Sequence, residues 1–198
     1  MRYDTITLAS ASPRRQALLG QIGVAHTVDP ADVDESRRPG EAPREYVLRL
    51  ARAKAESVFR RRPGALVLGA DTAVVLDGEL FGKPLDQNES VRMLRALGGR
   101  THEVLTAVAV RHPAGADARL SVSEVSLRAL SDAECRRYWD TGEPRGKAGG
   151  YAIQGLAARF VRWLGGSYSN VVGLPLYETV TLLAGHGYAP ARRIPARE

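Results

Sequence analysis

The sequence predicts an α/β fold in which helices flank a mixed β-sheet, with two lobes at most. Segments of helical and strand-like periodicity alternate along most of the chain, which is typical of this class. The stretch Ala65–Leu76 is an almost continuous apolar run, as in a strand covered on both faces. His102–Arg111 and Leu120–Leu130 follow one another without a helix between them and predict an antiparallel pair. Alternating elements combined with hairpins therefore predict a mixed sheet.

The first half of the chain is predicted to alternate short strands with two helices. Tyr3–Ala9 has the pattern of a strand, and in the helix that follows Ser12 is the expected N-cap and Pro13 the first helical residue. Gly23 ends that helix. The remaining expected elements are a strand at Val24–Val28, an acidic loop at Asp29–Ala42, a helix at Pro43–Arg61, the strand at Ala65–Leu76, a turn at Asp77-Gly78 and a return strand at Glu79–Phe81.

The second half is predicted to begin with a helix over Asp86–Leu97, closed by a Gly-Gly pair, before the antiparallel strands. Ser131 and Glu134 have the spacing of a capping box, which predicts a helix over Ser131–Thr141. A glycine-rich segment follows at Lys147–Gly155. The last expected elements are short strands at Phe160–Leu164 and Asn170–Val172 and a helix at Pro175–Gly185.

With 198 residues, of which 44% are hydrophobic, the chain is long enough for one domain. We expect this domain to span residues 1–188 and the Arg- and Pro-rich segment 189–198 to be a flexible basic tail. No apolar stretch reaches the length of a membrane helix, and the start shows no signal-peptide pattern. Cys135 is the only cysteine, which excludes an intrachain disulfide. A cytoplasmic location is the expectation.

The net charge of +6 and the pI of about 9.8 have two interpretations. One is an anionic partner such as a nucleotide. The other is a coding preference, since all but three of the 28 basic residues are arginine. Aromatic residues make up 6% of the chain and none interleave with a basic run, so no nucleic-acid groove is expected.

Asp71 is the most informative residue of the chain, because it stands within the apolar run Ala65–Leu76. Burying a lone carboxylate costs several kcal/mol, roughly, unless charge or hydrogen bonds compensate it. The sequence therefore predicts a metal ion, bound water or cationic side chains close to Asp71.

A second candidate site follows the first predicted strand, at Ser10-Ala11-Ser12-Pro13-Arg14-Arg15. Small residues let the backbone approach a ligand, and the helix N-terminus that follows favours an anion. Arg14 and Arg15 occupy the first turn of that helix, where a cation is unfavourable unless an anion is present. The segment is either a phosphate site or an ordinary pair of solvated arginines.

The three lysines, Lys54, Lys83 and Lys147, all lie in unusual contexts for an Arg-rich chain. Lys54 falls near the middle of the apolar stripe of its predicted helix. Its stem either packs along the core with the ammonium reaching solvent, or the ammonium points into a site and pairs with Asp71 or a phosphate. Lys83 lies in Gly82-Lys83-Pro84, and Lys147 opens a glycine-rich run.

Glu35 lies on the acidic loop, where it is either a solvated acid or a partner of Asp71 in an oxygen-only site for Mg²⁺ or Mn²⁺. The chain has no P-loop, no GxGxxG, no GxSxG and no zinc-ligand spacing. The sequence therefore does not support a P-loop nucleotide site, a dinucleotide site, a serine hydrolase or a zinc enzyme. Carboxylates that hold metal and water, with Arg and Lys that neutralise charge, favour phosphate chemistry.

The chain resembles the Maf family of nucleoside triphosphate pyrophosphatases through five ordered motifs between about Thr7 and Thr179. The resemblance rests on Leu8-Ala9-Ser10-Ala11-Ser12-Pro13-Arg14-Arg15, Gly69-Ala70-Asp71-Thr72, Gly82-Lys83-Pro84, Lys147-Ala148-Gly149-Gly150-Tyr151-Ala152-Ile153-Gln154-Gly155 and Asn170-Val171-Val172-Gly173-Leu174-Pro175. It implies an elongated α/β fold with a cleft between two lobes, similar to inosine-triphosphate pyrophosphatases. It also implies hydrolysis of a nucleoside triphosphate to the monophosphate and pyrophosphate.

By position, the resemblance makes Asp71 the proton acceptor. It places the side chains of Ser10, Arg14, Arg15, Glu35, Lys54 and Lys83 in the catalytic cleft, and makes Arg14, Thr72 and Gln154 specificity positions. We expect Asp71 and Glu35 to hold Mg²⁺ or Mn²⁺, and the cationic side chains to bind the triphosphate; the expected substrate-binding residues are Ser10, Arg14, Arg15, Thr72, Lys147 and Gln154.

The Ala-Ile-Gln-Gly sequence around Gln154 resembles the dTTP/UTP branch of the family. A glutamine amide offers one donor and one acceptor, which complement the N3–H and O4 of uracil or thymine. Two alternatives stay open: the same chemistry on modified or methylated nucleotides, and a non-catalytic nucleotide-binding regulator of septum formation. Gly82 occupies a place where some relatives have Glu, which leaves the metal geometry less defined. The sequence also leaves a homodimer open.

Overall fold

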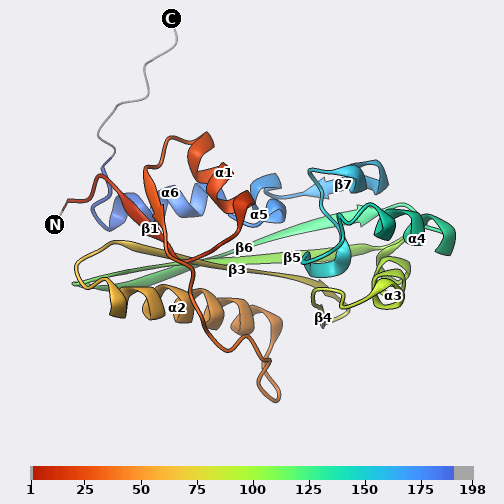
Figure 1. The fold of residues 1–198 in the computed structure, drawn as a ribbon, viewed down its shortest axis with the longest axis horizontal. Coiled ribbons are helices and arrows are strands. Elements are labelled where there is room, and N and C mark those ends of the chain that lie inside the picture. Colours follow the sequence, from red (N-terminus) through yellow and green to blue (C-terminus); the bar gives the residue numbers. More distant parts are fainter. Residues whose placement is uncertain (1, 190–198) are drawn as a thin grey trace, which may run out of the picture.

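The computed structural model describes residues 2–189 and shows an elongated α/β arrangement (Figure 1). Strands β3, β5 and β6 run along the long axis through two lobes. One lobe carries α1, α2 and α6, and the other carries α3, α4 and β7. The bounds of the elements are β1 Ile6–Leu8, α1 Pro13–Gln21, β2 His26–Val28, α2 Pro43–Arg61, β3 Val67–Leu76, β4 Glu79–Phe81, α3 Gln87–Leu97, β5 Thr101–His112, β6 Gly115–Leu127, α4 Asp132–Asp140, 3₁₀ turns Ala148–Gly150 and Leu156–Phe160, β7 Val161–Gly165, α5 Tyr168–Val172 and α6 Leu176–Gly185.

The sheet is mixed and has the strand order β2-β1-β3-β5-β6-β7, with β4 on the edge of β3. Strands β1, β2 and β3 are parallel to one another, whereas β5, β6 and β7 form antiparallel pairs. One edge of β3 pairs with β5 from Val67 to Val75. The opposite edge pairs with β1 at Val67–Leu68 and with β4 at Val74–Leu76. Residues 69–73 therefore have no strand partner on that edge, and a gap opens in the sheet between β1 and β4.

Helix α2 covers one face of the sheet at this gap. Its apolar stripe packs with β3 and β5 in a small-residue core that includes Ala51, Ala55, Ala73 and Ala107. A Cβ atom on Gly69 would lie 2.3 Å from the carbonyl oxygen of Ala51, so only glycine permits this close approach of helix and strand. The side chains of α2 that face β3 therefore lie directly against the residues of the gap.

The opposite face of the sheet packs against α1, α5 and α6 in a larger core of aliphatic and aromatic side chains, in which Leu8, Leu19, Leu68, Val108 and Leu182 are almost fully buried.

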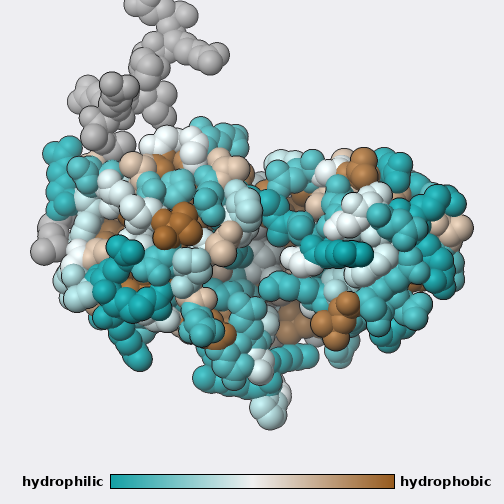
Figure 2. Space-filling view, viewed as in Figure 1, coloured by the Kyte–Doolittle hydropathy of each residue, from teal (hydrophilic) through white to brown (hydrophobic). Residues whose placement is uncertain are grey.

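Among residues 2–189, no helix is both long and apolar enough to cross a lipid bilayer. In the space-filling view a furrow separates the two lobes, and apolar side chains are scattered over a mostly hydrophilic face (Figure 2).

Several predictions from local sequence are confirmed to the residue. Helix α2 spans Pro43–Arg61 and β4 spans Glu79–Phe81, as predicted. The turn before β4 has positive φ at Asp77 (51°) and Gly78 (81°), the conformation of a type I′ hairpin. Helix α4 begins with the predicted capping box between Ser131 and Glu134. Strands β5 and β6 are antiparallel.

Other predictions are wrong, and each has a local reason. The predicted strand at Asn170–Val172 is part of helix α5, because the Ser167 hydroxyl caps the Asn170 N–H and starts a helical turn. The second strand of the long hairpin begins at Gly115 rather than Leu120, since the register continues to the pair His112 and Gly115. It also ends at Leu127.

The remaining differences are at the ends of elements. The first strand shrinks to Ile6–Leu8, and Tyr3 forms only an isolated bridge with Tyr188. Ser12 is the N-cap of α1 but makes no capping hydrogen bond; its own N–H donates to Ser10 Oγ. The predicted tail 189–198 lies outside the described residues except for Ala189.

Candidate active site

A cavity of about 1130 Å³ lies at the gap in the sheet. Every site residue predicted from the sequence lines it: Ser10, Arg14, Arg15, Glu35, Lys54, Asp71, Thr72, Lys83, Lys147 and Gln154. They come from the loop between β1 and α1, from α1 itself, the acidic loop, α2, β3, the loop after β4 and the glycine-rich segment. The fold thus gathers residues that are up to 144 positions apart in sequence around one cavity.

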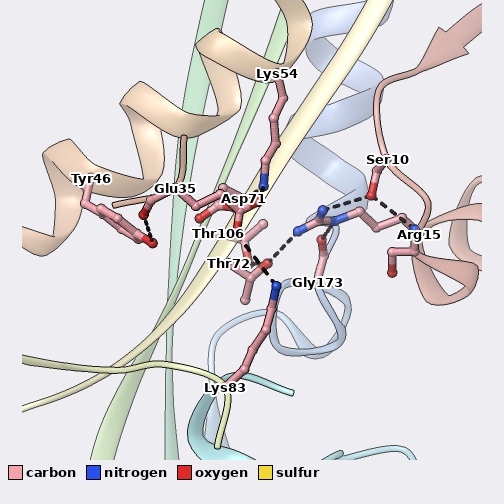
Figure 3. Close-up of polar contacts among 11 residues, drawn as sticks. Ser10, Arg15, Glu35, Tyr46, Lys54, Asp71, Thr72, Lys83, Thr106 and Gly173 are labelled. Carbon is pink, nitrogen blue, oxygen red and sulfur yellow. Dashed lines mark hydrogen bonds and ion pairs between the residues drawn. The ribbon is translucent and has the colours of Figure 1, made fainter. Parts of the chain in front are cut away.

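The centre of the cavity is a lysine held between two carboxylates (Figure 3). Lys54 Nζ lies 2.7 Å from Asp71 Oδ1 and 2.6 Å from Glu35 Oε1. Lys54 and Asp71 are buried, with 8% and 7% of their surface exposed, whereas Glu35 is partly exposed. Of the two interpretations of Lys54, the structure shows the one in which its ammonium points into a site and pairs with Asp71.

The pKa of Asp71 is raised above its usual range. Burial is the main cause, and it outweighs the opposing effect of Lys54. Asp71 Oδ1 accepts the hydrogen bond from Lys54. The other oxygen, Oδ2, accepts no hydrogen bond from residues 2–189 and is not fully buried. Asp71 therefore presents one free carboxylate oxygen of increased basicity to the cavity.

Glu35 is positioned by α2 through its backbone. Tyr46 donates a hydrogen bond from its hydroxyl to the Glu35 carbonyl oxygen at 3.0 Å, and Arg49 Nη2 donates to the Ser36 carbonyl at 3.0 Å. Burial acts to raise the pKa of Glu35, but the hydrogen bond and charge of Lys54, with Lys83 and Arg15, lower it overall. Lys83 Nζ lies 3.7 Å from Glu35 Oε2 and is largely exposed. Glu35 is thus an ionised acid at the mouth of the cavity.

Arg15 differs from Arg14 in having its guanidinium bonded to the protein. It donates to the Gly173 carbonyl at 2.8 Å, to Ser10 Oγ at 3.1 Å and to Thr72 Oγ1 at 3.2 Å. Burial lowers the pKa of Arg15, and Asp71 partly opposes that effect. These contacts tie α1 to β3 and to the segment after α5, so Arg15 with Ser10 and Thr72 forms a fixed wall of the cavity.

Arg14 and Lys147, by contrast, face the cavity as cations that form no salt bridge within the described chain, although the more distant charge of Glu143 acts to raise the pKa of Lys147. Burial lowers the pKa of Arg14, and burial together with the charge of Arg14 lowers the pKa of Lys147. Within residues 2–189 the Lys147 ammonium donates one hydrogen bond, to the Arg145 carbonyl at 3.2 Å. Burial disfavours both cations, and an anion bound beside them would stabilise them.

Part of the cavity lining is apolar, which suits a planar base better than a phosphate. The lining includes the apolar side chains of Val104, Ile153 and Val171 and also the exposed side chain of Gln154. Gln154 makes no side-chain hydrogen bond within residues 2–189, so its donor and acceptor are available to a ligand. Tyr151, also in the wall, is buried and its hydroxyl lies 2.7 Å from His102 Nε2.

Sequence reasoning missed Tyr46, Gly173 and Tyr151 as parts of this site. Tyr46 belongs to the apolar stripe of its predicted helix, and it lies eight residues before Lys54 and so on the same side of that helix. Gly173 and Tyr151 fall within recognised motifs, but nothing local shows that the Gly173 carbonyl accepts from Arg15 or that Tyr151 meets His102.

The two acids of the cavity fit a hard divalent cation. Glu35 and Asp71 are the only carboxylates in its lining, and no group of three His, Cys, Asp or Glu converges anywhere in the described part of the chain. Mg²⁺ is commonly held by one or two carboxylates with substrate phosphates supplying other ligands. Gly82 also lines the cavity and has open space where a side chain would be, so this chain lacks a third acid there.

Comparisons with known proteins identify close relatives of the chain. A family model described as Maf-like protein matches residues 5–186. A dTTP/UTP pyrophosphatase of Anaeromyxobacter dehalogenans is 56% identical over 188 residues, which covers 92% of this chain and 94% of the relative. Proteins of the same description from Hahella chejuensis and Bordetella avium are 50% and 51% identical, again over 92% of this chain and over 92% and 95% of their own lengths.

One solved structure, of the Staphylococcus aureus Ham1 protein, shares the fold with a TM-score of 0.51 at 13% sequence identity. The match covers 92% of this chain and 97% of that protein. At this level of identity the likeness concerns the fold alone, and it agrees with the expected α/β architecture.

Proposed function

The chain belongs to the Maf family, and from that membership and the cavity we propose that it hydrolyses dTTP and UTP to the monophosphate and pyrophosphate. The observation that carries the proposal is the pairing of buried Asp71 with Lys54 at the gap in the sheet. A protein that only binds nucleotides has no need of a buried carboxylate with a raised pKa and a free oxygen facing the ligand cavity.

In the proposed reaction Asp71 accepts a proton from the water molecule that attacks the α-phosphorus. The new bond joins the water oxygen to the α-phosphorus, and the bond between that phosphorus and the bridging oxygen to the β-phosphate breaks, so pyrophosphate leaves. The raised pKa of Asp71 strengthens it as a base, while the Lys54 ammonium keeps it ionised and fixes its orientation.

The cations around the cavity bind the triphosphate and stabilise the charge that develops on its oxygens. Arg14 and Lys147 are placed to bind phosphate oxygens directly, because both line the cavity and neither forms a salt bridge with a carboxylate among residues 2–189. Lys83 lies at the exposed mouth of the cavity beside Glu35. Arg15 and Ser10, already bonded to each other, shape the wall against which the phosphates pack.

Glu35 and Asp71 would hold Mg²⁺ or Mn²⁺ together with oxygens of the triphosphate. When bound, the divalent ion supplies positive charge to the phosphate oxygens. Lys54 Nζ contacts one oxygen of each carboxylate, Asp71 Oδ1 and Glu35 Oε1, so the second oxygen of each would be the one that holds the ion.

Base selection in this proposal falls to Gln154, whose amide pairs with the N3–H and O4 of uracil or thymine. The Thr72 hydroxyl, which accepts a hydrogen bond from Arg15 and lies 3.0 Å from Thr106 Oγ1, is held in place between the base and the phosphates in this proposal.

We further propose a cytoplasmic location, where these nucleotides are made, while a homodimer stays a prediction.

The direct test is pyrophosphate release by the purified protein from each common and methylated triphosphate, with and without Mg²⁺ or Mn²⁺. We expect release from dTTP and UTP that depends on the metal. Faster release from a methylated or modified nucleotide would reassign the substrate. Nucleotide binding without pyrophosphate from any triphosphate would contradict the proposed function and favour a binding protein.

A further inference from the structure

The carboxylate of Glu143 lies beneath the segment that carries Gln154. Glu143 Oε1 accepts hydrogen bonds from the Tyr138 hydroxyl at 2.6 Å and from the Ala157 N–H at 3.2 Å, and Oε2 accepts from the Leu156 N–H at 2.9 Å. These three donors satisfy an acid that has no lysine or arginine as a hydrogen-bonded partner in the described chain. Burial acts to raise the pKa of Glu143, but the three hydrogen bonds and the more distant charge of Lys147 lower it overall, so it is a carboxylate at neutral pH.

Tyr138 connects Glu143 to the other end of the same segment. Its side chain is fully buried and packs edge-to-face on Phe160, with ring centroids 5.3 Å apart. The hydroxyl donates to Glu143 and accepts a hydrogen bond from the Ala152 N–H at 3.1 Å. Tyr138 and Glu143 therefore fix residues 152, 156 and 157, and we call the segment from Tyr151 to Ala157 the base loop.

Gly155 shows how closely the base loop lies on this carboxylate. A Cβ atom at Gly155 would be 2.2 Å from Glu143 Oε2, far inside van der Waals contact. The φ of Gly155 is −115°, a value that any residue can adopt. Glycine is required here by the approach of the carboxylate and not by backbone conformation.

Gln154 lies midway between the anchored residues, two positions after Ala152 and two before Leu156. Its own side chain is exposed in the cavity and makes no hydrogen bond to residues 2–189. The position of its amide in the cavity is therefore set by the backbone of the base loop, and that backbone is set by Tyr138 and Glu143.

We propose that Glu143 is a positioning residue for base recognition: with Tyr138 it holds the base loop so that the Gln154 amide meets the pyrimidine edge. The inference rests on the proposed function, because it assumes that Gln154 contacts the base. Glu143 itself does not line the cavity, so it acts through the loop and not on the substrate.

A base-less ligand separates this role from general support of the fold. We would measure binding of α,β-methylene-UTP and of inorganic tripolyphosphate by calorimetry in Mg²⁺, for wild type, Glu143→Gln and Gly155→Ala. The amide of Glu143→Gln cannot accept the hydrogen bonds of both loop N–H groups, and the Cβ of Gly155→Ala displaces the carboxylate. Each change should weaken binding of the nucleotide analogue about tenfold and should not weaken binding of tripolyphosphate, because losing the Glu143 charge makes the site near Lys147 no less favourable for an anion.

The matched control is Glu134→Gln in the neighbouring helix α4. Glu134 is also a carboxylate with several hydrogen bonds, to Arg128 and the Ser131 cap, but it is not part of the cavity lining. It should lower the melting temperature without changing either affinity. Glu143→Gln and Gly155→Ala disturb the same contact. The double variant should therefore bind the nucleotide analogue less weakly than the product of the two single-variant losses in affinity would give.

Equal weakening of both ligands in Glu143→Gln, or no weakening of either, would overturn the proposal. If Glu143→Gln does not fold, Gly155→Ala carries the same test, since its backbone geometry accepts alanine. Pyrophosphate release from UTP by the wild type is measured beside these assays. Its absence would count against the proposed function, whereas normal release with unchanged analogue binding in the variants would count against the positioning role alone.

Discussion

Two ion-paired groups join helix α2 to the acidic loop, and they differ in hydrogen-bond geometry, in the pKa of their acids and in their place relative to the cavity. Arg49 binds Glu41 through two parallel hydrogen bonds of 2.5 Å and 2.8 Å, the fork geometry that suits a carboxylate. Lys54, five residues later, makes one contact to each of two different acids, Asp71 and Glu35. The first pair lies outside the cavity lining and the second lies at its centre.

The pKa values of the two acids move in opposite directions. The hydrogen bonds from Arg49 are the main cause that lowers the pKa of Glu41 to about 2. Burial raises the pKa of Asp71 despite its contact with Lys54. The charged form is thus favoured by the fold at Glu41 and disfavoured at Asp71. The first pair therefore holds the loop in place, while the second leaves a carboxylate ready to take a proton.

The largest expected effect is the loss of turnover in Asp71→Asn. An amide cannot accept the proton of the attacking water, and we expect kcat to fall by about 10³-fold or more. The melting temperature should stay the same or rise, because the substitution removes a buried charge and Lys54 retains Glu35. Pyrophosphate assays and thermal denaturation on the same preparation test both statements.

The control for Asp71→Asn is Glu41→Gln, which should lower the melting temperature at neutral pH and keep kcat close to wild type. An Asp71→Asn protein with near-normal turnover would remove Asp71 from the reaction. If Glu41→Gln proved as inactive as Asp71→Asn, the proposed division between a holding pair and a reacting pair would be wrong.

A smaller effect is expected when the cation is removed from each pair. Lys54→Met should lower kcat by about 10²-fold, because Asp71 loses the charge that keeps it ionised. The same variant should bind Mn²⁺ more tightly without nucleotide, since the two carboxylates are left without a cation. Titration of Mn²⁺ followed by electron paramagnetic resonance measures this directly. Arg49→Met should be less stable but lose far less activity, and equal losses in the two variants would contradict the comparison.

The smallest effect concerns the pH dependence of stability. The folded pKa of Glu41 is about 2, below the value of about 4.3 for an unfolded glutamate, so its contribution is present above the latter pH and is lost as pH falls toward the former. Asp71 has a raised pKa, so it favours folding below the unfolded pKa and loses that contribution as pH rises through the folded pKa.

Melting temperatures of the two variants across a pH series should therefore diverge from wild type with opposite signs. Glu41→Gln should be less stable than wild type near neutral pH and approach it in acid. The melting temperature of Asp71→Asn should rise relative to that of the wild type as the pH increases. Curves that run parallel to wild type for both variants would show that neither carboxylate is linked to folding.

The sequence predicts much of this site because several of its charged residues lie in otherwise apolar segments. An acid in an apolar strand and a lysine in an apolar stripe each require compensation, and Asp71 and Lys54 compensate one another. The helix α2 and the hairpin at Asp77-Gly78 are also predictable, because caps, turns and periodicity are local signals.

Features that depend on contacts between distant parts of the chain could not be predicted from the sequence. The gap between β1 and β4 depends on the register of both strands on β3, and no local pattern encodes it. The contrast between Arg14 and Arg15 depends on acceptors such as the Gly173 carbonyl, 158 residues away. The strand expected at Asn170–Val172 became helix α5 because a serine cap outweighed the β-branched residues.

The most direct test of the account is the fate of the water oxygen. UTP is hydrolysed by the wild-type protein in ¹⁸O-enriched water under single-turnover conditions, and the products are analysed by mass spectrometry. Attack by the water that Asp71 activates at the α-phosphorus predicts ¹⁸O in UMP and none in pyrophosphate. Label in pyrophosphate would place the attack on the β-phosphorus and contradict the reaction assigned to this cavity.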